Sequence, residues 1–320
     1  MGSSRPIRIG ARGSPLSLAQ TRLFAEHLAA ANQGLSYEIV PVTTTGDRIL
    51  DRSLVDSGGK GLFTKELDEA LLDKRIDLAV HSMKDLPTQL PNGVELACTP
   101  KREDPRDALI CSTANSLLEL PEDAKIGTAS LRRQAQLLAL RPTFNIVMLR
   151  GNVGTRLRKV ADDEVDATLL AYAGLKRLGL TDHVKALIDP IQAPPAAGQG
   201  ALAVTAFSEG GELHDALARV EDRATRLEVS AERAFLAALD GSCRTPIAAL
   251  GRWSNGILMF VGETLTPDGV RTWRRTAKEP CQTEAAAAAL GARLGDDILS
   301  EVRHASFTDR IDYPVGVDES

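Results

Sequence analysis

Short apolar runs recur along this chain, and several end in turns rich in Gly, Ser, Thr and Arg that lead into segments with helical spacing. Three of these turns, at residues 131–133, 149–156 and 174–177, follow one another and carry arginines. Strands that alternate with helices predict an α/β fold with a parallel sheet. In such a sheet the turns that follow the strands share the ligand-binding edge.

The arginines in these turns indicate a small ligand with several negative charges. Backbone N–H groups and helix N-termini bind anions, and the arginine fork adds paired hydrogen bonds to a carboxylate or phosphate. Arg12 follows the first predicted strand and repeats the arrangement elsewhere in the chain. The alternative for any single cluster is a solvated surface, which contributes little. Three clusters in succession at strand-to-helix junctions favour a binding site.

Composition excludes several classes of protein. The chain has 320 residues, 43% of them hydrophobic, and a formal charge of -5, which suits two or three globular domains. The acidic balance disfavours nucleic acid and anionic membranes as partners, because both attract basic surfaces. No apolar run approaches the roughly 20 residues of a membrane helix, and no signal-peptide core follows Met1. We therefore expect a cytoplasmic protein.

The order of the predicted elements indicates three domains. Residues 1–101 and 102–200 each alternate strands with helices, and an apolar strand at 201–205 is expected to return to the first sheet. The first domain therefore combines 1–101 with 201–220. Crossing segments are expected to join the two α/β lobes around a cleft. Residues 221–320 predict a small α+β domain, with strands followed by an alanine-rich helix.

Two local signals refine this prediction. Ser14 followed by Pro15 predicts the start of a helix, because serine caps helix N-termini and proline suits the first helical position. The glycine-rich run at 57–61 lies in a long loop, and its composition is typical of a lid. It is not a phosphate loop, since position 54 is leucine and Lys60 is followed by glycine rather than Ser or Thr. Neither ATP nor NAD is indicated.

Lys84 and Asp85 emerge together where a predicted buried strand ends. They form either a local ion pair or a functional pair, in which the cation binds a substrate carboxylate and the carboxylate faces a cationic or N–H-rich centre. His81, just before them, is interpreted as a core histidine. The four cysteines contain no Cys-x-x-Cys pair, so neither disulfides nor zinc are expected.

Cys243 differs from the other cysteines in its setting. It lies in a glycine-containing loop next to Arg244, whereas Cys98 and Cys111 occupy apolar runs and Cys281 a polar linker. A lone cysteine is more often buried and inert. Exposure beside a positive charge favours the thiolate and covalent chemistry. Cys243 is therefore the candidate for covalent attachment.

Taken jointly, these motifs resemble those of the porphobilinogen deaminase (hydroxymethylbilane synthase) family of tetrapyrrole biosynthesis. The resemblance runs from Arg5 to about Gly251. The family's cysteine loop usually reads Glu-Gly-Gly-Cys, whereas here Ser242 precedes the cysteine. The matching motifs are Gly10-Ala11-Arg12-Gly13-Ser14-Pro15-Leu16-Ser17, Gly58-Gly59-Lys60-Gly61-Leu62-Phe63, His81-Ser82-Met83-Lys84-Asp85-Leu86-Pro87, Leu131-Arg132-Arg133-Gln134, Leu149-Arg150-Gly151-Asn152-Val153-Gly154-Thr155-Arg156, Ala173-Gly174-Leu175-Lys176-Arg177-Leu178 and Gly241-Ser242-Cys243-Arg244-Thr245-Pro246-Ile247.

The resemblance implies two periplasmic-binding-protein-like α/β lobes, a C-terminal domain and a transferase of heme and porphyrin biosynthesis. It implies that the enzyme joins four porphobilinogen molecules to a dipyrromethane cofactor on Cys243 and releases hydroxymethylbilane. Asp85 is the implied catalytic residue, Lys60 lies in the implied lid, and a monomer without metal is expected. The residues implied to bind cofactor and substrate carboxylates are Arg12, Ser14, Ser82, Lys84, Arg132, Arg133, Arg150, Arg156 and Arg177.

Two other classes of function remain as alternatives. A non-catalytic two-lobed anion-binding protein uses the same arginine arrangement but needs neither Cys243 nor a third domain. A nucleic-acid-binding surface is disfavoured by the net charge and by an aromatic content of 4%, which offers few platforms for base stacking.

Overall fold

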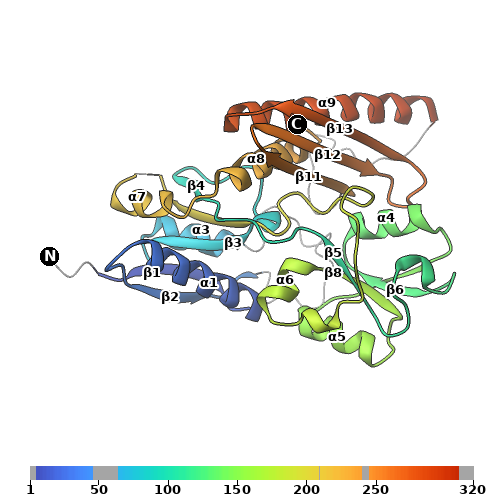
Figure 1. The fold of residues 1–320 in the computed structure, drawn as a ribbon, viewed down its shortest axis with the longest axis horizontal. Helices are drawn as coiled ribbons and strands as arrows, with labels where there is room; N and C mark the ends of the chain where they lie inside the picture. Colours follow the sequence, from blue (N-terminus) through green and yellow to red (C-terminus); the bar gives the residue numbers. More distant parts are fainter. Residues whose placement is uncertain (1–4, 46–63, 209, 240–244, 310–320) are drawn as a thin grey trace. The chain divides into compact units, whose positions relative to one another are not determined.

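The computed structural model describes residues 5–45, 64–208, 210–239 and 245–309, with side chains as far as residue 303. Figure 1 shows the helices and strands along the chain. The chain divides into two compact units. Unit 1 comprises Met1–Asp104, Lys176–Gly179 and Gly200–Arg226. Unit 2 comprises Pro105–Leu175, Leu180–Gln199 and Leu227–Ser320.

Unit 1 contains a five-stranded sheet in the order β2-β1-β3-β10-β4. Strand β1 (Ile7–Arg12) runs parallel to β2 (Tyr37–Val42) and β3 (Leu78–Ser82). Strand β10 (Leu202–Phe207) lies between β3 and β4 (Val94–Cys98) and is antiparallel to both. The predicted return of the chain to this sheet is confirmed. The direction of this returning strand was not predicted, and it makes the sheet mixed rather than wholly parallel.

The helices of unit 1 bury apolar side chains against this sheet. Helix α1 (Pro15–Ala31) begins as predicted: Ser14 is its N-cap, and the Ser14 Oγ accepts a hydrogen bond of 3.3 Å from the Ser17 backbone N–H. Helices α3 (Lys65–Leu72) and α7 (Glu212–Ala218) also belong to this unit. Core side chains from α1, α7 and the strands include Ile9, Phe24, Leu28, Leu78, Val204 and Leu217.

Unit 2 contains a second five-stranded sheet in the order β7-β6-β8-β5-β9. Strand β6 is parallel to β7 and β8, whereas β5 is antiparallel to β8 and β9. This sheet is therefore also mixed rather than parallel. The strands are β5 (Asp107–Cys111), β6 (Lys125–Thr128), β7 (Asn145–Met148), β8 (Ala167–Ala171) and β9 (Ala186–Leu187).

The predicted order of strand, turn and helix is confirmed after β6 and β7 but is wrong after β8, where a helix starts at once and contains the predicted turn at 174–177. A helix thus follows each of these three strands. These are α4 (Leu131–Leu140), α5 (Val153–Ala161) and α6 (Tyr172–Arg177). Ser130 caps α4 by accepting from the Arg133 backbone N–H, and Asn152 caps α5 by accepting from that of Thr155. Because these two caps come from the turns before α4 and α5, the turns hold Arg132, Arg133 and Arg156 close to the helix starts, whereas Arg177 ends α6.

The C-terminal part of the chain forms the predicted α+β arrangement (Figure 1). An antiparallel sheet of β11 (Ile247–Ser254), β12 (Ile257–Leu265) and β13 (Thr272–Pro280) shares a core with helices α8 (Arg223–Ala238) and α9 (Glu284–Asp309). Residues from 227 onward belong to the same compact unit as 105–175. The three domain boundaries drawn from the sequence therefore stay a prediction.

The fold adds elements that the sequence analysis did not predict, namely α7 and β9. The predicted alanine-rich helix is α9, which extends to Asp309. Among the described residues, none of the helices combines the length and the apolar character that crossing a bilayer requires.

Candidate functional site

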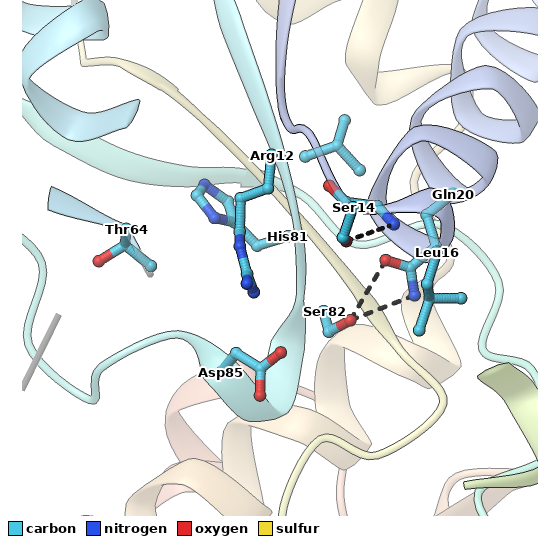
Figure 2. A pocket seen from close by; sticks show the side chains of 10 residues that line it. Arg12, Ser14, Leu16, Gln20, Thr64, His81, Ser82 and Asp85 are labelled. Atoms are coloured by element: carbon cyan, nitrogen blue, oxygen red, sulfur yellow. Dashed lines mark hydrogen bonds between the residues drawn. The ribbon is translucent and has the colours of Figure 1, made fainter. Parts of the chain in front are cut away.

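A polar pocket opens in unit 1 where β1 and β3 end beside the start of α1 (Figure 2). Parallel strands place their carboxyl ends at one edge of a sheet, so residues that follow β1 and β3 meet there. Four predicted site residues line this pocket: Arg12, Ser14, Ser82 and Asp85. The other lining residues are Leu16, Ser17, Gln20, Thr64, Val80 and His81.

Arg12 and Asp85 supply opposite charges to this pocket. Arg12 is the last residue of β1, and Asp85 ends the 3-10 turn Met83–Asp85 that follows β3. Figure 2 shows both side chains extending into the same space. Asp85 is exposed and Arg12 is half-buried. A carboxylate and a guanidinium thus line the same pocket. Lys84 lies in the same turn as Asp85 but not among the lining residues.

Ser82 is oriented by a residue that the sequence analysis missed. The Gln20 Nε2 donates to the Ser82 Oγ at 3.1 Å, and the Ser82 hydroxyl can in turn donate to the Gln20 Oε1 at 3.2 Å (Figure 2). Gln20 is 4% exposed. A polar residue on the buried face of α1 was the signal that could have identified it, because buried polar groups need partners.

His81 is a core histidine, as predicted. Its Nε2 lies 3.1 Å from the Thr205 Oγ1, and the side chain is buried. Burial, together with the positive charge of Arg12, lowers the pKa of His81 to about 4. The ring is therefore neutral at neutral pH.

The predicted arginines of α4 lie in a different setting, buried inside unit 2. The Arg132 Nη2 contacts one oxygen of Asp107 at 2.9 Å, and the Arg133 Nη2 donates to the other at 2.7 Å. The three side chains are between 5% and 7% exposed. Burial opposes ionisation of Asp107, but the charges of Arg132 and Arg133 hold its pKa well below the usual range. The cluster is therefore fully ionised.

Arg132 is held by further contacts on α4 and the following linker. Its Nη1 donates to the Gln136 Oε1 at 2.9 Å and to the Pro194 carbonyl at 3.2 Å. The Nε atoms of Arg132 and Arg133 are buried and have no hydrogen-bond partner among the described residues. Each guanidinium therefore retains an unsatisfied donor, which is costly in a protein interior.

The remaining predicted arginines of these turns, Arg150, Arg156 and Arg177, are half-buried. The Arg156 Nε donates to the Gly151 carbonyl at 2.9 Å, and burial followed by the charge of Arg133 lowers the pKa of Arg156 to about 10. The Arg177 Nη2 donates to the Gly200 carbonyl at 2.6 Å, and burial lowers the pKa of Arg177 to about 10. Both remain cationic at neutral pH. Arg150 is half-buried just after β7.

The predicted site residues thus divide between the two units. Unit 1 holds Arg12, Ser14, Ser82, Lys84, Asp85 and Arg177, whereas unit 2 holds Arg132, Arg133, Arg150 and Arg156. Cys243 and Lys60 lie outside the described residues. The sequence analysis missed Asp107. The signal that could have identified it is its position as a charged residue directly before the apolar run 108–111.

The three described cysteines are buried free thiols. Burial, with the negative charge of Glu221, raises the pKa of Cys98 far above its usual range, as suits a structural residue. The sequence analysis predicted that Cys281 lies in a polar linker. This prediction is wrong, because Cys281 packs into the C-terminal core and is 2% exposed. Within the described part of the chain, no three His, Cys, Asp or Glu side chains gather as metal ligands.

In comparison with known proteins, the chain matches the models of two protein domains. Residues 7–215 match "Porphobilinogen deaminase, dipyromethane cofactor binding domain", and residues 226–300 match "Porphobilinogen deaminase, C-terminal domain". A porphobilinogen deaminase of Caulobacter sp. (strain K31) is 51% identical over 309 residues, which cover 93% of this chain and 97% of that protein. One of Phenylobacterium zucineum is 50% identical over 308 residues, with 92% and 96% covered.

Among solved structures, a periplasmic substrate-binding protein of an ABC transporter from Coxiella burnetii covers 68% of this chain and 93% of its own. Its TM-score is 0.42 and its sequence identity 16%.

Proposed function

The chain belongs to the porphobilinogen deaminase family, and on that premise we propose that it is a hydroxymethylbilane synthase. The enzyme deaminates four porphobilinogen molecules, joins them head to tail onto a covalently bound dipyrromethane primer and releases hydroxymethylbilane. The observation that carries this proposal is the pocket of unit 1, where Arg12 and Asp85 meet beside the capped start of α1.

The pocket suits the chemistry of porphobilinogen. This substrate carries an acetate and a propionate, a pyrrole N–H and an aminomethyl group that leaves as ammonia. Arg12 and the N-terminal end of α1 offer positive charge and donors to a carboxylate. Asp85 offers an acceptor to the N–H group. One molecule can thereby contact both charged groups that line the pocket.

Asp85 is proposed as the catalytic residue. Loss of ammonia leaves positive charge on the pyrrole of the substrate, and a fixed carboxylate stabilises charge that develops during a reaction. The Asp85 oxygens accept a hydrogen bond from the pyrrole N–H and take up or return the proton that each coupling displaces. The exposure of Asp85 keeps it accessible to successive substrates.

The arginines are proposed to bind the carboxylates of cofactor and growing product. The buried, unsatisfied Nε donors of Arg132 and Arg133 fit this role, because a carboxylate accepts paired hydrogen bonds from a guanidinium edge. Arg156 and Arg177 are half-buried and cationic. When bound, the dipyrromethane supplies the free pyrrole carbon to which substrate is added. Arg150 and Lys84 complete the proposed set.

Several parts of the proposal concern residues or properties outside the described structure. Cys243 is proposed to hold the cofactor by a thioether, and the segment around Lys60 to cover the site. We further propose a cytoplasmic monomer of three domains that acts in heme and porphyrin biosynthesis, without metal or nucleic acid as partners.

Incubation with porphobilinogen tests the proposed function. An active enzyme consumes porphobilinogen, releases ammonia and yields bilane, which cyclises and oxidises to a porphyrin with a strong visible absorbance. A non-catalytic anion-binding protein would bind porphobilinogen without consuming it.

The mass of the purified protein tests cofactor attachment separately. The intact mass should exceed the sequence mass by one dipyrromethane, and peptide mapping should place the adduct on Cys243. An adduct on Cys98, Cys111 or Cys281 would refute the assignment. Cys243→Ser should lack the adduct, whereas Cys281→Ser should retain it.

A further inference from the structure

Asp107 binds both arginines of the buried cluster, Arg132 and Arg133. It is the first residue of β5, and its two oxygens are shared between the Arg132 Nη2 at 2.9 Å and the Arg133 Nη2 at 2.7 Å. The Gln199 Nε2 donates to the same carboxylate at 2.9 Å and to the Pro105 carbonyl at 2.7 Å. Both Asp107 and Gln199 are buried. The carboxylate is therefore fixed from three directions.

This arrangement decides which edge of each guanidinium remains available. Two neighbouring guanidinium groups repel one another, and Asp107 offsets that repulsion by binding one Nη group of each. The Nε donors of both arginines stay without a partner among the described residues. One negative charge against two positive charges also leaves this trio with a net positive charge. Both features favour a further carboxylate at the cluster.

We propose that Asp107, supported by Gln199, is a positioning residue that holds Arg132 and Arg133 with their Nε edges ready for a carboxylate of the dipyrromethane or the growing pyrrole chain. This inference rests on the proposed function. Asp107 acts through the two arginines and does not itself bind substrate. Its role is to keep two like charges side by side in a geometry that neither would hold alone.

A second aspartate of this chain provides a matched control. Asp77, in unit 1, also pairs with two arginines: its oxygens accept from the Arg5 Nη2 at 2.8 Å and from the Arg8 Nη2 at 2.9 Å. Asp77 lies just before β3, at the end of the strand opposite to the pocket residue Ser82. An asparagine at position 77 removes a comparable pair of ion contacts without touching the proposed site.

The experiment compares Asp107→Asn with Asp77→Asn in the purified holoenzyme. Intact mass gives the fraction of molecules that carry dipyrromethane, and steady-state kinetics are normalised to that fraction. For Asp107→Asn we expect lower occupancy and a KM for porphobilinogen raised about tenfold or more, since hydrogen bonds to charged groups are strong. The kcat should change much less. Asp77→Asn should keep wild-type occupancy and KM, even if its thermal stability falls.

A graded variant protects the test against misfolding of Asp107→Asn. Gln199→Leu removes one hydrogen bond from Asp107 and leaves both ion pairs, so occupancy and KM should move in the same direction by a smaller factor. If both position-107 and position-199 variants match Asp77→Asn in occupancy and KM, Asp107 is only a structural ion-pair partner and the inference is overturned. A wild-type protein that fails to consume porphobilinogen would instead overturn the proposed function.

Discussion

The pocket of unit 1 and the arginine cluster of unit 2 arise from the same local pattern but differ in environment. Both lie where strands of a sheet lead into helices with side-chain caps. In the pocket, Asp85 is exposed and Arg12 half-buried. In the cluster, Arg132 and Arg133 are almost fully buried and carry their own counterion, Asp107. The strand-to-helix junctions therefore supply charged residues in both units, whereas the degree of burial determines whether these residues meet water and substrate or are held in fixed ion pairs.

The difference in burial indicates different roles for the two groups of residues. An exposed carboxylate meets each new substrate and exchanges protons with water. Buried guanidinium groups stay charged and oriented, and their attraction for a carboxylate is stronger because little water screens it. We therefore expect substitutions in the pocket to reduce turnover and substitutions in the cluster to weaken binding.

The largest expected effect comes from Asp85→Asn. It keeps the shape of the side chain but removes the negative charge, so kcat should fall about 10²–10⁴-fold. Thermal unfolding should stay near wild type, because Asp85 is exposed. Asp73→Asn, which alters another exposed aspartate of unit 1, is the control. Near-normal bilane formation by Asp85→Asn would remove the proposed catalytic role.

An intermediate effect is expected from Arg133→Leu. The loss of one guanidinium should lower cofactor occupancy or raise the KM for porphobilinogen about 10–100-fold, as expected for a charged hydrogen-bonding group. The same direction is expected for Arg132→Leu and Arg156→Leu. Arg141→Leu offers a control at the end of α4, where Arg141 binds the Leu118 and Leu120 carbonyls. Unaltered kinetics in all three variants would make these arginines structural.

The smallest effect concerns a buried aspartate that, unlike Asp107, has no arginine partner in the described contacts. Asp68 on α3 is 5% exposed, and burial raises its pKa to about 6 from 3.8. The folded protein therefore binds a proton more tightly than the unfolded chain, and this contribution to stability is present below pH 3.8 and lost as the pH rises through 6.

Asp68→Asn should accordingly stabilise the protein at pH 8, by about 1–3 kcal/mol at 1.36 kcal/mol per pKa unit. The gain should become small near pH 3.5, where the wild-type carboxyl is neutral in the folded state and mostly neutral in the unfolded chain. Chemical unfolding at the two pH values measures it, with the exposed neighbour Glu69→Gln as the control. A gain of equal size at both pH values would show that protonation is not its cause.

Much of the local structure could be predicted from the sequence. The cap at Ser14, the strands before the arginine turns, the return strand at 201–205 and the order of the C-terminal elements all follow from short-range patterns. Such patterns depend on periodicity and on turn chemistry within a few residues. Four residues of the unit 1 pocket could also be predicted, because the end of a strand is a local feature, whereas Gln20, within α1, was missed.

The sequence by itself determined the elements, the family motifs and the presence of arginines at strand-to-helix junctions. Only the tertiary structure decided that β10 runs antiparallel to β3 and that β5 runs antiparallel to β8. It also decided that Cys281 is buried and that Asp107 binds Arg133, which lies 26 positions further along the chain. The physical reason is that ion pairing and burial depend on which strands become neighbours. Placing β5 beside β8 brings a carboxylate under two arginines that no local pattern connects to it.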